Sequence, residues 1–335
     1  MSMAAVYLQE QGSVLAREGR RLVVRKDGQE ILAIPIHRVD RVVLLGRIQI
    51  TADAAALLLE RNVPLVMASS RGRIRGILTP PQSPHIRLRK AQYTLFSDPD
   101  WHLAFAKDLV LAKAENCQAV LRRYRYNHPL VGVKSDEMDI QTSASNIPKA
   151  YDLETIRGLE GLISRCYFAG LTKVFASLKM GFGGRIRRPP TDPVNAVLSF
   201  TYVLLTGLVS SALEVEGLDP FCGVLHSPNR AAPALALDML EQFRQPFADR
   251  FTMLLFNKRI LGPEDFSPGP MQSVRLVPAA KQRLLVEWEK FLLLEQGLGA
   301  GPEKTSPIQV LRQKAHELRQ AILDGAAYQH FRLGG

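Results

Sequence analysis

The sequence has few cysteines, few aromatic residues and fewer acidic than basic side chains. Its three cysteines, Cys117, Cys166 and Cys222, are odd in number and lack CxxC spacing, which argues against a disulfide framework or a zinc ribbon. With 32 acidic against 43 basic residues, the formal net charge is +11, which favours a polyanionic partner such as nucleic acid. We expect a protein of the reducing cytoplasm.

Long uncharged apolar runs are also scarce. The one such segment, residues 196–213, approaches the length of about 18 residues that spans a membrane. Serines, threonines and a glycine dilute it, and Glu214 and Glu216 follow at once. We therefore expect a buried core helix, and we expect no secretory signal because no charged leader precedes an apolar stretch at the start of the sequence.

The hydrophobic pattern of the sequence changes from strand-like to helical near residue 85. Short Val-, Ile- and Leu-rich runs separated by turns such as Lys26-Asp-Gly predict strands in the first part, with one short helix capped by Thr51. After a proline-rich linker at residues 80–84, apolar residues at i, i+3 and i+4 predict helices almost to the end. The sequence predicts an α+β fold, with a β-rich domain at residues 1–84 and a larger all-α-helical domain at 85–335.

The expected strands and helices have these approximate bounds. Strands are expected at 5–8, 14–17, 21–25, 31–36, 41–45, 48–50, 65–68 and 74–78. Helices are expected at 86–95, 100–126, 152–178, 193–216, 231–247, 279–295 and 307–323. Residues 127–148 and 297–305 are expected to be exposed loops.

Carboxylates and an imidazole recur in three segments of the helical part. Asp238 and Glu241 lie three residues apart in a helical pattern, so their carboxylates share one face. His226 precedes that helix in a loop, and Glu160 comes from another helix. Such a set in a basic protein predicts a divalent-metal site for phosphodiester chemistry. Each residue alone has an ordinary interpretation: an exposed helix face, a turn histidine, or an ion pair between Glu241 and Arg244.

Basic residues form three further candidate nucleic-acid contacts. One is the flexible loop with Arg185, Arg187 and Arg188, for which a plain solvated connection is an equal alternative. The others are a strand face with Arg71, Arg73 and Arg75, and the long helix that carries Lys107, Lys113, Arg122, Arg123 and Arg125.

Four ordered motifs carry a resemblance to a known family. They are Gly158 to Phe168, Arg188 to Tyr202, Gly217 to His226, and Leu235 to Arg244. Their order and spacing resemble the CRISPR-associated adaptation integrases, the Cas1 family. The resemblance covers nearly the whole chain, with Glu241 standing where some relatives have Asp.

The resemblance implies catalytic residues Glu160, His226, Asp238 and Glu241, of which Glu160, His226 and Glu241 would bind Mn²⁺ or Mg²⁺. It also implies DNA contacts from Arg185, Arg187, Arg188 and Asn195. The implied activity inserts captured DNA fragments at a CRISPR repeat, through attack of a 3′-hydroxyl on a phosphodiester, or cuts DNA as an endonuclease.

The implied assembly is a homodimer formed through the β domain, joined by a small CRISPR-associated partner dimer in a heterohexamer that binds double-stranded DNA with 3′ ends and repeat DNA. Whether an additional processing nuclease joins is left open. Alternatives are a branched-DNA nuclease or transposon-type integrase of the same fold, and a non-catalytic DNA-binding scaffold.

Overall fold

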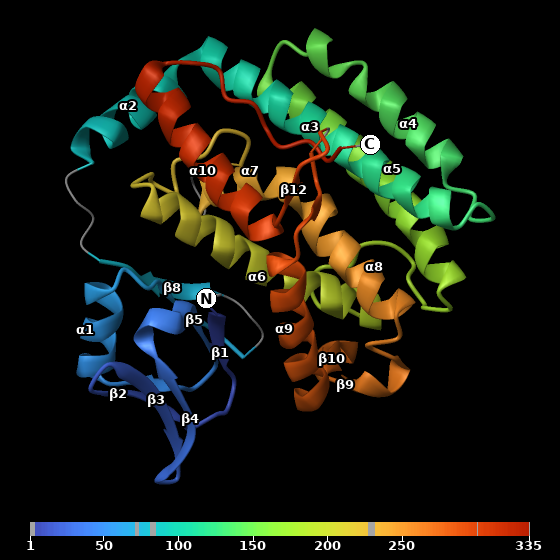
Figure 1. Cartoon of the computed structure of the whole chain (residues 1–335). Coiled ribbons are helices and arrows are strands. Elements are labelled where there is room, and N and C mark those ends of the chain that lie inside the picture. The colour runs from blue at the N-terminus through green and yellow to red at the C-terminus, as the bar shows by residue number, and fades with distance from the viewer. Residues whose placement is uncertain (1–3, 71–73, 81–84, 227–231, 300, 335) are drawn as a thin grey trace. The chain divides into compact units, whose positions relative to one another are not determined.

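The computed structural model describes residues 4–70, 74–80, 85–226, 232–299 and 301–334 (Figure 1). Within it the chain forms two compact units, residues 1–85 and 86–335. Arg71, Arg73, most of the predicted linker and the predicted helix start at residue 231 lie outside the described residues.

The N-terminal unit contains two four-stranded sheets. In the first, with order β1-β5-β7-β8, β5 pairs in parallel with β1 and β7, and β8 is antiparallel to β7. In the second, with order β4-β3-β2-β6, two antiparallel pairs are followed by a parallel one. The strands are β1 Ala4–Leu8, β2 Val14–Glu18, β3 Arg21–Lys26, β4 Gln29–Pro35, β5 Val39–Leu45, β6 Gln49–Ile50, β7 Leu65–Ala68 and β8 Ile74–Leu78.

Local sequence explains the turns and the helix of this unit. Gly19 and Gly28 have positive φ in the two hairpin turns, a conformation that glycine adopts without strain. Helix α1, Ala52–Glu60, begins where the Thr51 side chain accepts a hydrogen bond from the Ala54 N–H. Apolar residues of the strands and of α1, among them Leu15, Val42 and Leu58, form one buried core.

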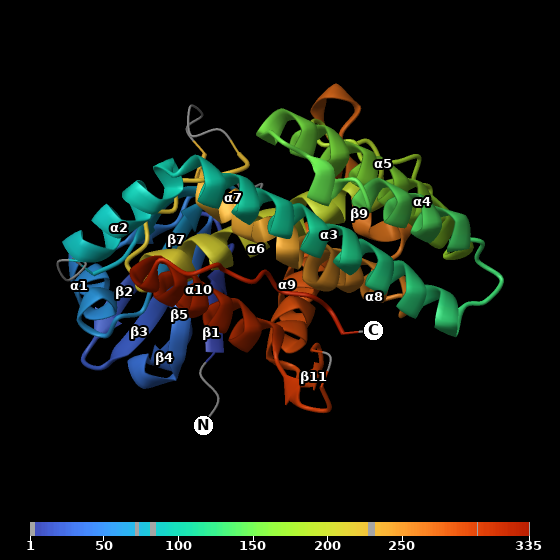
Figure 2. The ribbon, with the colours of Figure 1, turned by 90° about the horizontal axis from the view of Figure 1, so that it is seen from above.

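The second unit is mainly helical, so the predicted α+β fold class is confirmed. Its helices are α2 Ile86–Ser97, α3 Pro99–Asn127, α4 Lys134–Ala144, α5 Leu153–Ser177, α6 Pro193–Val215, α7 Ala234–Phe243, α8 Arg250–Asn257, α9 Pro278–Leu293 and α10 Pro307–Asp324. Two short hairpins accompany them, β9 Phe266–Pro268 with β10 Val274–Leu276, and β11 Gln296–Gly297 with β12 Lys304–Thr305. Helix α3 packs along α4 and α5, as Figure 2 shows, and against α7.

Helix α6 occupies the interior of this unit. By length and composition it is the one helix among the described residues that could span a membrane, but 72% of its apolar window is buried inside the protein. This burial agrees with the predicted core helix.

The predicted exposed loop at residues 127–148 is wrong, because α4 forms within it. Its buried face contains the carboxylates of Asp136 and Glu137, which pair with Lys173 and Arg125. A helix that packs through ion pairs lacks the apolar periodicity on which the prediction rested. Helix α8 and the hairpin of β9 and β10 were also not predicted, and the predicted loop at residues 297–305 begins and ends in the paired strands β11 and β12.

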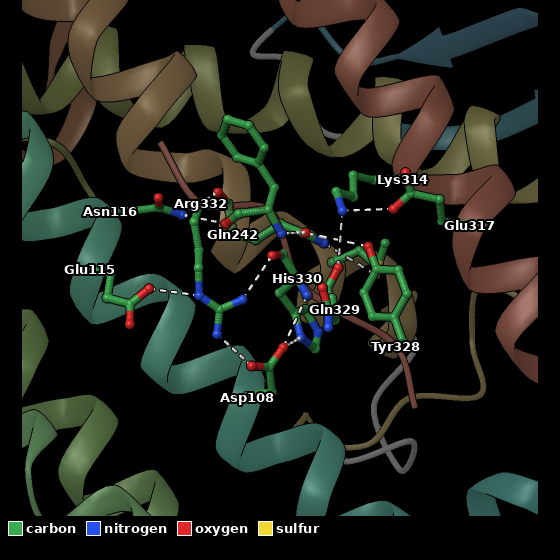
Figure 3. A network of polar contacts seen from close by, with 12 residues as sticks. Asp108, Glu115, Asn116, Gln242, Lys314, Glu317, Tyr328, Gln329, His330 and Arg332 are labelled. Carbon is green, nitrogen blue, oxygen red and sulfur yellow. Dashed lines mark hydrogen bonds and ion pairs between the residues drawn. The ribbon is translucent and has the colours of Figure 1, made fainter. Parts of the chain in front are cut away.

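Residues 326–334 form an extended segment that runs along α3, where it contacts Asp108, Glu115 and Asn116 in turn (Figure 3). Asn116 on α3 donates to the carbonyl oxygens of Gln242 and Phe331, at 2.9 Å each, and accepts from the Leu333 N–H at 2.7 Å. Phe331 packs against the rings of Phe243 and Phe247. We call residues 326–334 the C-terminal strap.

Candidate active site

Helices α3, α5 and α7 bring the predicted acidic residues together. Glu160 lies on α5, and Asp238 and Glu241 lie one turn apart on α7, while His226 lies in the turn before α7. Glu241 and Asp238 are buried, whereas the Glu160 side chain is 27% exposed. The site thus has a closed side formed by α7 and an open side at Glu160.

A lysine connects the two glutamates. Lys113 Nζ, from α3, contacts Glu160 Oε1 and lies 2.7 Å from Glu241 Oε2. Its side chain is only 2% exposed. Burial disfavours the charged amine, but Glu241 and Glu160 together raise the pKa of Lys113 above its usual value, so the ammonium form is retained.

An arginine completes the charge balance. Arg244 Nη1 lies 2.7 Å from Glu241 Oε1, the ion pair that the sequence offered as the ordinary interpretation of Glu241. Burial favours the neutral carboxylic acid, but Arg244 and Lys113 outweigh it and lower the pKa of Glu241 to about 2. Glu241 is therefore an anion at any physiological pH.

Asp238 organises the loop that carries His226. Its carboxylate accepts hydrogen bonds from the backbone N–H groups of Val224, Leu225 and His226. His226 Nδ1 lies 2.7 Å from Asp238 Oδ1. The loop lies so close to α7 that a Cβ on Gly223 would come within 2.6 Å of the Ala234 carbonyl carbon.

The bond to Asp238 decides how His226 can act. Burial lowers the pKa of the imidazole, yet the hydrogen bond and the charge of Asp238 raise it above its ordinary value. With Nδ1 held by a carboxylate, Nε2 is the nitrogen left to act as a ligand, an arrangement common in metal-binding histidines.

A third buried carboxylate, that of Asp249, lies near the site. Helix α7 continues into a π-helical segment, Arg244–Asp249, and such segments are frequent at functional sites. Asp249 Oδ1 accepts a hydrogen bond of 2.6 Å from the Tyr202 hydroxyl. Burial raises the pKa of Asp249 to about 6, and Arg244 lies over the Tyr202 ring.

The predicted DNA-contacting residues divide into two kinds. Arg187 and Arg188 are exposed. Asn195 is fully buried, and its amide bonds to Arg185, Ile186, Gly184 and Asp192. Arg185 also donates to Ser199 and lies over the Tyr202 ring. Asn195 and Arg185 therefore hold the loop in shape, while Arg187 and Arg188 face solvent.

The donor set fits a divalent cation. Carboxylate oxygens and an imidazole nitrogen suit Mn²⁺, and the carboxylates suit Mg²⁺. The Lys113 ammonium already occupies the point shared by Glu160 and Glu241, as a cation would. Among the described residues, no group of three or more His, Cys, Asp or Glu is placed to hold a metal. Lys113 lies between the two glutamates, and His226 Nδ1 bonds to Asp238.

Comparison with known proteins identifies the family. A family model described as CRISPR associated protein Cas1 matches residues 6–290. This chain belongs to the Cas1 family. CRISPR-associated endonuclease Cas1 1 of Thermus thermophilus is 33% identical to it over 331 residues, which cover 98% of this chain and 99% of the relative. The family predicted from the four motifs is confirmed.

Solved structures share the fold of this Cas1 chain. A casposase bound to integration product matches with a TM-score of 0.82 and 23% identity, over 97% of this chain and 91% of that one. A chain of a Cas6-RT-Cas1--Cas2 complex matches with a TM-score of 0.80 and 22% identity, over 99% of this chain and 36% of that one. At these identities the likeness shows the fold alone.

Sequence reasoning missed the role of Lys113, which it grouped with the basic residues of α3 that were predicted to contact nucleic acid. One signal was available. Lys113 lies three and four residues from Val110 and Leu109, on the apolar stripe of its helix. A lysine on such a stripe is rarely buried unless it is paired, so it predicts a buried carboxylate nearby.

Proposed function

We propose that this chain is a CRISPR adaptation integrase, which inserts captured DNA fragments at a CRISPR repeat by metal-dependent transesterification. Membership of the Cas1 family makes it an enzyme of the nuclease and integrase class. The observation that carries the finer proposal is the convergence of Glu160, Glu241 and the Asp238–His226 pair at one partly open site.

Glu160, His226 and Glu241 would hold Mn²⁺ or Mg²⁺. When bound, the metal would activate the attacking 3′-hydroxyl and neutralise charge on the phosphate. Glu241, kept ionised by Arg244, supplies a permanently anionic ligand from the closed side, and Glu160 supplies one from the open side.

Asp238 would act as a positioning residue. By accepting a hydrogen bond from Nδ1–H it fixes the tautomer and ring orientation of His226, and by accepting hydrogen bonds from three backbone N–H groups it fixes the loop. The exposed Arg187 and Arg188 would contact DNA phosphates, while Asn195 and Arg185 shape the loop that presents them.

The assembly that we propose follows the complexes in which solved relatives occur, a casposase bound to integration product and a Cas6-RT-Cas1--Cas2 complex. This chain would form a homodimer through its β domain, residues 1–84, and join a small partner dimer on double-stranded DNA. Residues 85–335 would form the catalytic domain. A transposon-type integrase is the second candidate, because the casposase shares the fold of nearly the whole chain.

Strand transfer tests the proposal. A duplex with 3′-hydroxyl ends is incubated with a supercoiled plasmid that carries a repeat, with Mn²⁺ and the partner, and insertion sites are sequenced. We expect wild type to insert at the repeat edge, His226→Ala to bind DNA without inserting, and the exposed-histidine control His316→Ala to insert normally. Equal insertion by His226→Ala would refute the metal site. Insertion without preference for the repeat would favour the transposon-type enzyme.

A further inference from the structure

Lys113 lies where a metal ion would lie. Its ammonium contacts one oxygen of each glutamate, Oε1 of Glu160 and Oε2 of Glu241. Glu241 Oε2 is buried and receives no aligned hydrogen bond from the described part of the chain. Its nearest charge is thus the Lys113 ammonium, 2.7 Å away, which occupies the place beside this oxygen.

The two glutamates are already balanced by positive charge without a metal. Lys113 and Arg244 carry two positive charges, and Glu160 and Glu241 carry two negative ones. Arg244 pairs with Glu241 Oε1 and packs over the Tyr202 ring, so it is held away from the oxygen that Lys113 contacts. Of the two cations, only Lys113 lies between the two predicted glutamate ligands.

A divalent cation and an ammonium cannot share this position. Like charges a few ångströms apart in a buried site repel strongly, since little water screens them. A metal that binds Glu160 and Glu241 must therefore push the Lys113 amine away from them. Lysine can move in this way because its charge lies at the end of a flexible chain.

We propose that Lys113 is a built-in competitor of the catalytic metal, a resident cation that holds Glu160 and Glu241 together in the metal-free enzyme and weakens metal binding until it is displaced. The proposal rests on the proposed function, because it takes these glutamates as the metal ligands. Its consequence is that the enzyme binds metal poorly by itself. The displaced ammonium would then be free to pair with a phosphate of the entering DNA.

A purely structural ion pair predicts the opposite effect. If Lys113 only held the glutamates in place, its removal would let them separate and would weaken metal binding. If Lys113 competes, its removal leaves two carboxylates short of positive charge and strengthens metal binding. The direction of the change separates the two roles.

The test measures Mn²⁺ binding to the full-length chain without DNA, by electron paramagnetic resonance of free Mn²⁺ and by calorimetry. Lys113→Met removes the charge with a side chain only one atom shorter, and Lys113→Gln, of the same reach as methionine, also keeps hydrogen-bonding capacity. The matched control is Lys173→Met, which removes a lysine of α5 that pairs at 2.6 Å with the buried carboxylate of Asp136. We expect both Lys113 variants to bind Mn²⁺ about tenfold more tightly than wild type, and the control to match wild type.

Equal or weaker binding by folded Lys113 variants would overturn the inference and leave the proposed metal site intact. Absence of saturable binding in wild type and in the variants alike would instead refute the metal site, and the inference with it. If the Lys113 variants bind Mn²⁺ more tightly but the wild-type enzyme shows no strand transfer, the competitor role of Lys113 is supported and the proposed integrase activity is refuted.

Folding is followed in parallel by circular dichroism, because the variants lose a buried ion-pair partner. A variant that folds only with Mn²⁺ supports the proposal. If neither variant folds, the test uses the wild-type protein, with acetic anhydride labelling of Lys113 measured by mass spectrometry. We expect labelling to increase when Mn²⁺ is added, because the displaced amine becomes accessible. Unchanged labelling would overturn the proposal.

Discussion

Two polar networks join α3 to α7 one helical turn apart, and they differ in charge. In the first, Lys113 of α3 meets Glu241 of α7. In the second, Asn116 of α3 binds the Gln242 carbonyl oxygen of α7 and two backbone groups of the C-terminal strap. The same two helices are thus joined by an ionic contact at Lys113 and, one turn away, by a neutral amide contact at Asn116.

The amide network has the features of a structural element. Asn116 is fully buried, and its side chain makes three hydrogen bonds with backbone groups. The ionic network has buried charges, an oxygen without an aligned donor, and one edge open at Glu160. Buried charge that is only partly satisfied is a poor way to stabilise a fold, so its presence points to chemistry. Changes to the amide network should therefore alter stability, and changes to the ionic network should alter metal binding and activity.

The largest expected effect on stability is that of Asn116→Ala. The substitution leaves two carbonyl oxygens and one N–H without their partner inside the protein, and each buried unsatisfied group destabilises the fold. We expect the free energy of unfolding to fall by about 4 kcal/mol, as measured by urea denaturation.

The matched control for Asn116→Ala is Asn127→Ala at the exposed end of the same helix, where the amide makes one bond to the Arg123 carbonyl oxygen. It should change the free energy by about 0.5 kcal/mol or less. A loss of Mn²⁺ affinity in folded Asn116→Ala, rather than of stability, would contradict the division between the two networks.

Asp238→Asn should affect stability and metal binding together, because Asp238 serves the loop and His226 at once. Asparagine keeps one acceptor oxygen but turns an NH₂ group toward backbone N–H donors. We expect a loss of about 2 kcal/mol in the free energy of unfolding. Mn²⁺ affinity should fall by about tenfold or more, because His226 loses the carboxylate that orients it. Unchanged affinity in calorimetry would show that Asp238 does not position the ligand.

Much of the fold followed from periodicity, and α4 shows where periodicity stops working. The strands of the first unit are short apolar runs between turns, and the long helices bury one apolar face, so both patterns in the sequence report the structure. Helix α4 buries Asp136 and Glu137 against Lys173 and Arg125, residues far away in the sequence. No local pattern records such partners.

The acidic and imidazole residues of the candidate site could be predicted from the sequence because residue type and order carry the family resemblance. The sequence could not show that Glu241 faces Lys113 from a helix more than a hundred residues away. Nor could it separate the buried Asn195 from the exposed Arg187, since both lie in one polar segment. Pairing across helices is a property of packing and is fixed only in three dimensions.

A pH dependence should appear in the strap network through His330. This histidine is buried, and burial lowers its pKa from the usual 6.5 despite the hydrogen bond to Asp108. As pH falls, His330 is therefore protonated at a higher pH in the unfolded chain than in the folded protein. The free energy of unfolding decreases as pH falls below 6.5. We expect His330→Gln to be less stable than wild type at neutral pH but to lose less stability between pH 6.5 and about pH 5. Parallel thermal unfolding curves across that range would contradict this.

The smallest expected effect is that of Glu115→Gln, at the outer edge of the strap network. Glu115 pairs with Arg332 at 2.6 Å, but the two side chains are 43% and 35% exposed. Water screens such a pair, and Arg332 keeps its second partner, Asp108. Urea denaturation should therefore show a loss of about 0.5 kcal/mol, with Mn²⁺ affinity and strand transfer unchanged. A change in metal affinity from this exposed position would mean that the strap transmits strain to Lys113 one turn away, and that the two networks act as one.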